Sequence, residues 1–322
     1  MISRFKIAIR KLLLRESTKN LYKNMSKVKA KLMRFLSDEQ FTKLNLKHNT
    51  GIKLNLKNPK MFVEKINWLK LNYRNDLQTE YTDKYLMKQH LIDNEYGNLL
   101  PPLLGAYDNF NDINFEKMPD KVFLKTNHTS GVNQAVEKNQ TNLKKTKEKF
   151  DAAMKDNYFK YSREWNYKNI KPKILVEEYL DMTEFIDYKF FVFEGKVEFF
   201  AVIKNINDEQ GNQSLESKIN LYDTDQNKMN IDIKRQEFVD DDFEFSKFIP
   251  EMIEVSENLA SKFPFCRVDF FVSKDKLYFG EMTFHPNGGQ LVLYPLENEL
   301  KYGEKIHLNK IPQSDLKKQL NH

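Results

Sequence analysis

The chain has 322 residues, of which 40% are hydrophobic and 13% aromatic, so it is long enough for two or three lobes and too apolar to be disordered. It contains one cysteine, which excludes an intramolecular disulfide and fits a reducing compartment. The formal net charge is +6, but residues 1–34 carry eleven Lys and Arg against one Glu, which leaves the remainder at −4. The basicity therefore belongs to an N-terminal arm.

No part of the sequence reaches the roughly 18 to 20 uninterrupted apolar residues that a membrane span needs. The N-terminus also lacks the continuous hydrophobic region of a secretion signal, because Arg10 and Lys11 separate two short apolar runs. We therefore expect a cytoplasmic protein.

Residues 1–36 are predicted to form a basic arm of two amphipathic helices, because apolar positions recur every three or four residues in 2–14 and in 22–35. Such helices can pack on the body or on a partner subunit with a solvated lysine face. They can also lie on the anionic inner leaflet of a membrane, as a peripheral contact through residues 1–34. No nucleic-acid-binding motif accompanies the charges, so nucleic acid is not expected as a partner.

Residues 37–118 are predicted to form a helical N-terminal lobe. The spacing of apolar residues predicts one helix over 61–71 and another from 83 to about 95, with Thr82 as its N-cap. The stretch 99–107, which contains two prolines, reads as an extended connection.

Residues 119–180 are predicted to form a second, smaller lobe. Its expected elements are strands over 121–126 and 174–180, with a long lysine-rich helical stretch over 141–165 between them.

Residues 181–322 are predicted to form the C-terminal lobe. A hairpin is expected over 188–193 and 197–204, and a helix over 250–262. Residues 205–247 are polar and weakly patterned, and we interpret them as an excursion with a mobile loop.

A second hairpin in this lobe, over 266–272 and 277–284, carries the most informative pattern. A period of two places Arg267 and Asp269 on one face of its first strand, and Glu281 and Thr283 on one face of its second. The opposite faces are predicted to lie in the core; they carry Val268, Phe270, Met282 and Phe284. Cys266 is expected to be a buried thiol.

The register of that hairpin decides whether its two carboxylates meet. A three-residue turn over 274–276 places Asp269 opposite Glu281, whereas a two- or four-residue turn slips the register and sends them to different faces. We therefore predict a loop of odd length. Two carboxylates that meet form a site for a hard divalent cation bound to polyphosphate.

Two further stretches suit a nucleotide. Lys125 leaves a strand beside the polar turn 127–133, where an ammonium and backbone N–H groups can hold phosphate, although a solvated lysine is the simpler alternative. The acidic strand end 177–180 can offer backbone groups to adenine, and Asp187 can accept from ribose hydroxyls; a purely structural role is the alternative. No Walker A or GxGxxG pattern is present.

The order of these features resembles the ATP-grasp superfamily, in which two α+β lobes clamp ATP. Particular stretches are similar to its TupA-like branch, which is named for teichuronopeptide biosynthesis and occurs in bacterial surface-polysaccharide gene clusters. The resemblance covers roughly residues 37–308, and the stretches that carry it are 54–59, 64–69, 82–85, 102–108, 163–165, 171–172, 187–190, 263–269 and 278–281.

The resemblance implies an α+β ATP-grasp fold with a helical N-terminal extension, and ATP bound with two Mg²⁺ ions. It assigns nucleotide binding to two lysines that hold phosphates, a phosphate loop, an adenine hinge, a ribose-binding carboxylate and a third lysine. These residues are Lys84 and Lys125, Ser130 and Gly131, Glu177, Glu178, Tyr179 and Leu180, Asp187, and Lys189.

The resemblance also assigns metal and catalytic roles. The metal ligands would be Asp269, Glu281, Thr283 and Asn287; Thr283 stands where many relatives have asparagine, and Asn287 would supply an oxygen ligand. Arg267, with Lys125, would stabilise charge on the transferring phosphoryl group. His128 is a candidate for general-base or substrate work, and a hydrogen-bonded loop histidine is its alternative.

The resemblance implies a carboxylate–amine ligase that forms an acyl phosphate and then an amide with a uronic-acid-type carboxylate. Its expected partners are therefore a small-molecule or saccharide carboxylate and an amine. A kinase acting on a sugar or polyol would use the same ATP site, and a non-catalytic scaffold of the capsule machinery would not turn ATP over.

Overall fold

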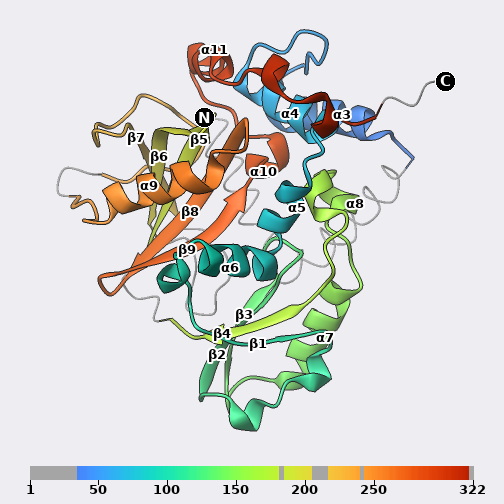
Figure 1. Cartoon of the computed structure of the whole chain (residues 1–322), viewed down its shortest axis with the longest axis vertical. Coiled ribbons are helices and arrows are strands. Elements are labelled where there is room, and N and C mark those ends of the chain that lie inside the picture. Colours follow the sequence, from blue (N-terminus) through green and yellow to red (C-terminus); the bar gives the residue numbers. More distant parts are fainter. Residues whose placement is uncertain (1–34, 181–184, 205–216, 240–242, 319–322) are drawn as a thin grey trace. The chain divides into compact units, whose positions relative to one another are not determined.

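The computed structural model describes residues 35–180, 185–204, 217–239 and 243–318 (Figure 1). Nearly all of the predicted basic arm lies outside these ranges, as do parts of the polar 205–247 stretch. The chain divides into two compact units, 1–54 and 55–322. The lobe boundaries expected from the sequence stay predictions. Among the described residues, no helix is long and apolar enough to cross a membrane.

In the first unit the described residues contain one helix, α3 (Asp38–Thr50). It begins with a reciprocal cap: the Gln40 N–H donates to Ser37 Oγ at 3.2 Å, and the Ser37 N–H donates to Gln40 Oε1 at 3.0 Å. It ends at Gly51, whose φ of 80° suits the left-handed position after a helix.

The second unit opens with α4 (Phe62–Asn72), α5 (Asp76–Thr82) and α6 (Lys84–Asp93). The helix predicted over 61–71 is confirmed to within one residue. The prediction that Thr82 caps the next helix is wrong, because Thr82 ends α5 and its hydroxyl donates to the Gln78 carbonyl at 2.6 Å. Asp83 caps α6 instead, and its carboxylate accepts from the Tyr85 N–H at 2.8 Å.

The first sheet has four antiparallel strands in the order β1-β4-β2-β3. The strand β1 comes from a stretch that the sequence predicted only as an extended connection, and it pairs with β4. Helix α7 packs against β2 (Figure 1) over a core that includes Phe110, Leu124 and Phe150. The bounds are β1 Leu103–Tyr107, β2 Lys121–Thr126, β3 Asn133–Glu137, β4 Ile174–Glu178 and α7 Leu143–Met154.

The helical stretch predicted over 141–165 is broken into three pieces. After α7 come α8 (Phe159–Ser162) and the 3-10 helix η4 (Trp165–Tyr167). Arg163 lies between α8 and η4. Its left-handed φ of 58° ends α8, and the chain changes direction there before Glu164.

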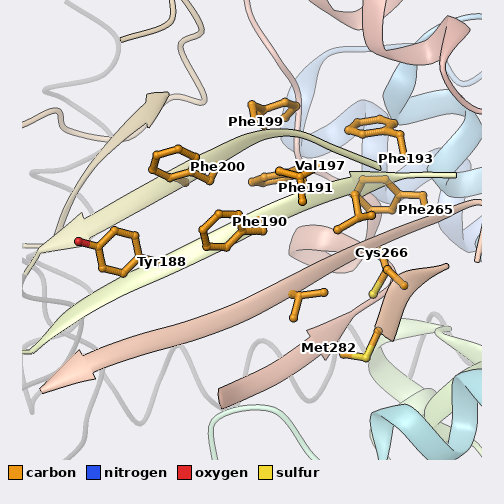
Figure 2. Packing of buried hydrophobic residues seen from close by; sticks show 14 of the residues in the cluster. Tyr188, Phe190, Phe191, Phe193, Val197, Phe199, Phe200, Phe265, Cys266 and Met282 are labelled. Atoms are coloured by element: carbon orange, nitrogen blue, oxygen red, sulfur yellow. The ribbon is translucent and has the colours of Figure 1, made fainter. Parts of the chain in front are cut away.

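The second sheet has five antiparallel strands in the order β7-β6-β5-β8-β9, with α9 packed against β5, β6 and β8. Figure 2 shows its aromatic core, in which the rings of Phe191 and Phe199 stack with centroids 4.4 Å apart. Phe190 and Phe191 point to opposite faces and both are buried, so the sheet is covered on both sides. The bounds are β5 Ile186–Phe193, β6 Lys196–Lys204, β7 Lys218–Tyr222, α9 Ile249–Ala260, β8 Phe265–Ser273 and β9 Lys276–Thr283.

The chain continues through a short turn, α10, and a helix, α11, that packs against α4. A side chain at Gly303 of α11 would place its Cβ 2.0 Å from the Lys60 carbonyl oxygen, so this close approach requires glycine. The bounds are α10 Pro286–Gly289 and α11 Leu296–Glu304, with further 3-10 helices η1 Gly97–Leu99, η2 Phe110–Asp112, η3 Phe115–Lys117, η5 Leu308–Lys310 and η6 Gln313–Asp315.

Candidate active site

The β8–β9 hairpin has the predicted register. Asp269 lies opposite Glu281 and Arg267 opposite Thr283. The predicted odd-length loop is wrong: two residues, Lys274 and Asp275, join the strands, with φ values of 47° and 56° typical of a tight hairpin turn.

A β-bulge reconciles the short turn with the register. Phe279 pairs with Phe270 and Glu281 pairs with Asp269, so Gly280 is one extra residue on β9. A Cβ at this position would lie 3.0 Å from the Asp269 carbonyl oxygen. A side chain at Gly280 would therefore have to displace the Asp269 carbonyl, and the bulge returns Glu281 to the face that carries Asp269.

Asp269 is buried at the centre of an ionic network. Arg267 donates from Nε to Oδ1 and from Nη2 to Oδ2, both at 2.6 Å, and Nη2 also donates to Thr283 Oγ1 at 3.0 Å. Lys189, which lies opposite Asp269 in the β5–β8 pairing, donates to Asp269 Oδ2 at 2.6 Å. Burial alone would raise the pKa of Asp269, but Arg267 and Lys189 outweigh it and hold that pKa below its ordinary value.

The structure places Asp187 beside this network. Its Oδ2 lies 2.8 Å from the Lys189 ammonium, which also holds Asp269. Burial raises the pKa of Asp187 to about 6, against the opposing charge of Lys189. The sequence predicted ribose binding for this carboxylate, and the structure places it beside Asp269, which was predicted as a metal ligand.

A second ionic cluster ties α6 to the first sheet. Glu177, 3% exposed on β4, receives Lys88 Nζ at 2.8 Å and Lys125 Nζ at 2.9 Å on its two oxygens. Burial favours a raised pKa for Glu177, but the two lysines hold it below its ordinary value, and burial lowers the pKa of Lys88. Sequence reasoning missed Lys88; its spacing of four from Lys84, on one face of a helix, was the available signal.

A cleft with an empty volume of about 330 Å³ joins these parts. Lys84 Nζ lies 3.5 Å from Glu281 Oε2 and donates to the Thr129 carbonyl at 3.0 Å. The lining includes both charged and apolar side chains; it consists of Lys84, Lys88, Lys125, Glu281, Gly280, Thr82, Tyr81, Met87, Leu100 and Phe279. A cleft that offers both cations and apolar side chains suits a nucleoside polyphosphate.

The other residues predicted for the nucleotide do not line this cleft. Ser130 and Gly131 lie exposed in the loop after β2, and Glu178 is exposed at the end of β4. The ring of Tyr179 receives the Lys121 ammonium 4.0 Å from its centroid. Leu180 is half-buried, immediately before residues that lie outside the described ranges.

His128 is 2% exposed in the loop after β2. Its ring nitrogens lie 3.2 Å from Asn127 Oδ1 and 3.1 Å from the Ala153 carbonyl. Burial lowers the pKa of this histidine. The geometry matches the hydrogen-bonded loop histidine that the sequence left open as the alternative.

Asn287 lies in a left-handed turn after β9. The φ values of Asn287, Gly288 and Gly289 are 53°, 64° and 85°. Helix α4 holds this turn, because Lys70 Nζ donates to the Gly288 carbonyl at 2.8 Å and Asn67 Nδ2 to the Gly289 carbonyl at 2.6 Å. Gly288 and Gly289 adopt these φ values without strain, so asparagine and the two glycines suit the turn that Lys70 and Asn67 hold.

Asp269 and Glu281 are oxygen donors of the kind that magnesium takes. Both oxygens of Asp269 also accept hydrogen bonds, from Arg267 and Lys189. Asp269 and Glu281 face each other across the hairpin, and Mg²⁺ is commonly bound through one or two carboxylates together with substrate phosphates. Within the described ranges, no group of three or more His, Cys, Asp or Glu is arranged to hold a metal ion by itself. Thr283 Oγ1 is engaged by Arg267, and Asn287 is exposed.

A cluster that sequence reasoning did not assign lies around Glu164. This carboxylate is 4% exposed, and its Oε2 is 3.4 Å from Nδ1 of His285, which is 2% exposed. The rings of Tyr158 and Tyr167 meet edge to face at 4.7 Å. Burial, with the charges of Glu164 and Glu281, raises the pKa of Tyr167 well above its ordinary value and that of Tyr158 to about 12.

This architecture, with a cleft lined by three lysines and Glu281, is that of an ATP-grasp protein. The family model described as TupA-like ATPgrasp matches residues 64–307, about three quarters of the sequence, and the chain belongs to this family. The resemblance drawn from the sequence is thus confirmed, as is the α+β ATP-grasp fold.

Solved structures of several ligases are similar to the chain. For the D-alanine–D-alanine ligase from Bacillus anthracis the identity is 16%, over 75% of this chain and 71% of that one, with a TM-score of 0.45. The D-alanine–D-alanine ligase from Helicobacter pylori is 14% identical over 76% of this chain and 69% of that one, with a TM-score of 0.41. An L-amino acid ligase from Bacillus licheniformis is 14% identical over 73% of this chain and 51% of that one, with a TM-score of 0.40. Comparison with curated proteins gave no match. The assignment rests on the family match.

Proposed function

We propose that the protein is an ATP-dependent carboxylate–amine ligase of surface-polysaccharide biosynthesis. The observation that carries the proposal is the cleft lined by Lys84, Lys125 and Glu281, in which Lys84 pairs with Glu281 and Glu281 lies opposite Asp269. Membership of the TupA-like family supports the ATP-grasp chemistry. The polysaccharide context comes from the resemblance to that branch.

In this proposal adenine packs against the apolar side chains of the cleft and its lysines receive the phosphates. Lys84 and Lys125 hold phosphate oxygens, each as a point charge. Asp269 and Glu281 hold Mg²⁺, which when bound screens the charge of the phosphates and orients them. Arg267, fixed by its two bonds to Asp269, stabilises charge on the transferring phosphoryl group.

The reaction has two steps. A carboxylate oxygen of the first substrate attacks the γ-phosphorus of ATP, and ADP leaves with the electrons of the broken P–O bond. The nitrogen of the amine then attacks the acyl carbon, inorganic phosphate leaves, and the nitrogen gives up a proton. Positioning and charge stabilisation suffice for such a transfer, so no protein nucleophile is needed.

The proposed carboxylate is a uronic acid and the proposed amine an amino acid. The test is mass-spectrometric screening of products and ADP release, with ATP, Mg²⁺, candidate uronates and candidate amino acids. A ligase releases ADP only when both co-substrates are present, and it yields a condensed product.

Glu281→Gln is the matched control for this screen, and we expect it to abolish turnover. ADP release with a hydroxyl acceptor alone identifies a kinase instead. Mg-ATP binding that calorimetry does not detect identifies a scaffold. Full activity of Glu281→Gln would contradict the metal assignment.

A further inference from the structure

Lys189 is a buried cation that two carboxylates share. It lies opposite Asp269 in the β5–β8 pairing, and Asp187 stands two residues earlier, on the same face of β5. The Lys189 ammonium lies 2.6 Å from Asp269 Oδ2 and 2.8 Å from Asp187 Oδ2. The side chain of Lys189 is 14% exposed, and those of the two carboxylates are more deeply buried. Lys189 does not line the nucleotide cleft, although the sequence predicts that it binds the nucleotide.

Asp269 is close to the limit of the hydrogen bonds that it can accept. An ionised carboxylate offers about four acceptor positions, about two on each oxygen. Arg267 Nε uses one position on Oδ1, while Arg267 Nη2 and Lys189 Nζ use both positions on Oδ2, all at 2.6 Å. A metal ion that binds through Oδ2 must therefore displace one of these two donors.

Lys189 is the donor that moves at the lower cost. The Arg267 guanidinium is a rigid fork held by both oxygens of Asp269 and by Thr283 Oγ1, so its displacement breaks three hydrogen bonds. The Lys189 ammonium is a compact charge on a flexible stem, and it keeps its contact with Asp187 when it leaves Asp269. Release of Lys189 therefore leaves no buried cation unpaired.

The charges of this network also oppose a metal ion that arrives alone. The network holds two carboxylates and two cations, so its formal charges sum to zero; its members are Asp187, Asp269, Lys189 and Arg267. Glu281, the other carboxylate proposed for the metal, lies 3.5 Å from a lysine ammonium. A lone divalent cation therefore meets a neutral network with an ammonium beside Asp269. Nucleotide phosphates supply the missing negative charge and further oxygen ligands.

We propose that Lys189 is the counter-ion of the metal site, a positioning residue that excludes free Mg²⁺ and admits it only together with nucleotide phosphates. In the empty protein the Lys189 ammonium holds Asp269 in place of the metal. On binding of the metal–nucleotide complex, the ammonium moves toward Asp187 and frees Oδ2 of Asp269. This role rests on the metal assignment in the function proposed above, and it stands in place of the nucleotide contact predicted for Lys189.

Removal of the Lys189 charge should tighten metal binding, which is the opposite of what removal of a nucleotide-binding lysine would do. Mn²⁺ takes the same oxygen ligands as Mg²⁺, and its binding to the nucleotide-free protein is measured from the electron paramagnetic resonance of the free ion. We expect Lys189→Met to bind Mn²⁺ at least about 10-fold more tightly than the wild type, because a repelling charge is lost and an acceptor position opens. Lys189→Arg keeps the charge and should stay within about threefold of the wild type.

Three further variants locate the effect. Lys305→Met removes a lysine that pairs with Glu198 outside the site, and it should leave Mn²⁺ binding unchanged. In Lys189→Met/Glu281→Gln the gain should disappear. Lys189→Gln keeps an N–H donor for Asp269 and should show the same gain with a smaller loss of stability; urea unfolding midpoints establish which variants are folded. In calorimetry with Mg²⁺ and a non-hydrolysable ATP analogue, neither Lys189→Met nor Lys189→Gln should lose affinity.

The outcomes separate this role from the ligase. Mn²⁺ affinities of Lys189→Met and Lys189→Gln no higher than that of the wild type overturn the counter-ion, as does an equal gain in Lys305→Met. A loss of nucleotide affinity of about 10-fold or more without a gain for Mn²⁺ identifies Lys189 as a nucleotide contact instead. A gain that survives Glu281→Gln places the metal elsewhere and overturns the metal assignment as well. A product screen that yields no amide overturns the ligase and leaves the role of Lys189 to be decided by Mn²⁺ binding alone.

Discussion

The ionic cluster of Glu177 with Lys88 and Lys125 predicts a large and specific loss of stability. Glu177→Gln keeps the volume of the side chain but removes the charge that both ammonium groups face, at 2.8 and 2.9 Å. Lys88 is 5% exposed, whereas Lys125 is less deeply buried. The variant therefore leaves one buried cation uncompensated.

The magnitude follows from what it costs to break a buried ion pair. Removal of one partner typically costs about 3 to 5 kcal/mol, because the remaining charge has already lost its hydration. With a urea slope of about 3 kcal/mol per M, the unfolding midpoint should fall by roughly 1 to 2 M. A Lys88→Met/Glu177→Leu double variant should recover at least half of that loss, since it removes the buried charge on both sides.

Urea unfolding followed by tryptophan fluorescence measures the change in the free energy of unfolding of these variants, because both tryptophans, Trp68 and Trp165, lie in the 55–322 unit. The control is Glu39→Gln, which breaks an exposed pair with Lys43 and should change the free energy of unfolding by less than about 1 kcal/mol. A loss below about 1 kcal/mol for Glu177→Gln, or a double variant less stable than Glu177→Gln, would refute the reasoning.

Three further predictions concern single residues. Lys84→Met should weaken binding of a non-hydrolysable ATP analogue about 10- to 100-fold in calorimetry, because it removes a proposed phosphate contact, with little change in the unfolding midpoint. Gly280→Ala should weaken binding of the Mg²⁺ complex about tenfold, since its Cβ would press on the Asp269 carbonyl at 3.0 Å; unchanged binding would show that the bulge can relax. Burial raises the pKa of Glu299 to about 7, from an ordinary 4.5. The contribution of Glu299 to the free energy of unfolding is therefore fully present below about pH 4.5. About 3 kcal/mol of that free energy is lost as the pH rises to 7, because the carboxyl group ionises more readily in the unfolded chain. Glu299→Gln should flatten this slope in thermal unfolding.

The hairpin illustrates how far the sequence leads. The alternation of Arg267 and Asp269 with apolar neighbours identified the polar face of the hairpin, and Glu281 lies opposite Asp269 as predicted. The predicted turn length was wrong because a period of two shows which face of a strand each side chain occupies but does not reveal a bulge. Gly280 was the visible signal, since a glycine inside a strand often marks a bulge.

The sequence did not predict the other contacts of the site because they join residues that lie far apart in the chain. Lys189 reaches Asp269 because β5 pairs with β8, and Lys88 reaches Glu177 because α6 packs beside a strand that lies far along the chain. Local patterns carry no information on such partners. Glu164 belonged to a stretch that identified the family, but nothing in its neighbours indicated that the carboxylate would be buried against His285.

Cys266, the one cysteine of the chain, can report on the opening of β8, the strand that carries Asp269. Cys266 is fully buried next to Arg267 and Asp269, and burial raises its pKa well above the ordinary value. A thiol reagent can therefore modify it only when β8 opens, so the rate of labelling measures the free energy of that local opening. A ligand that clamps Asp269 must slow the labelling in proportion to its affinity. The occupancy of the site can thus be followed by simple alkylation kinetics before any substrate has been identified.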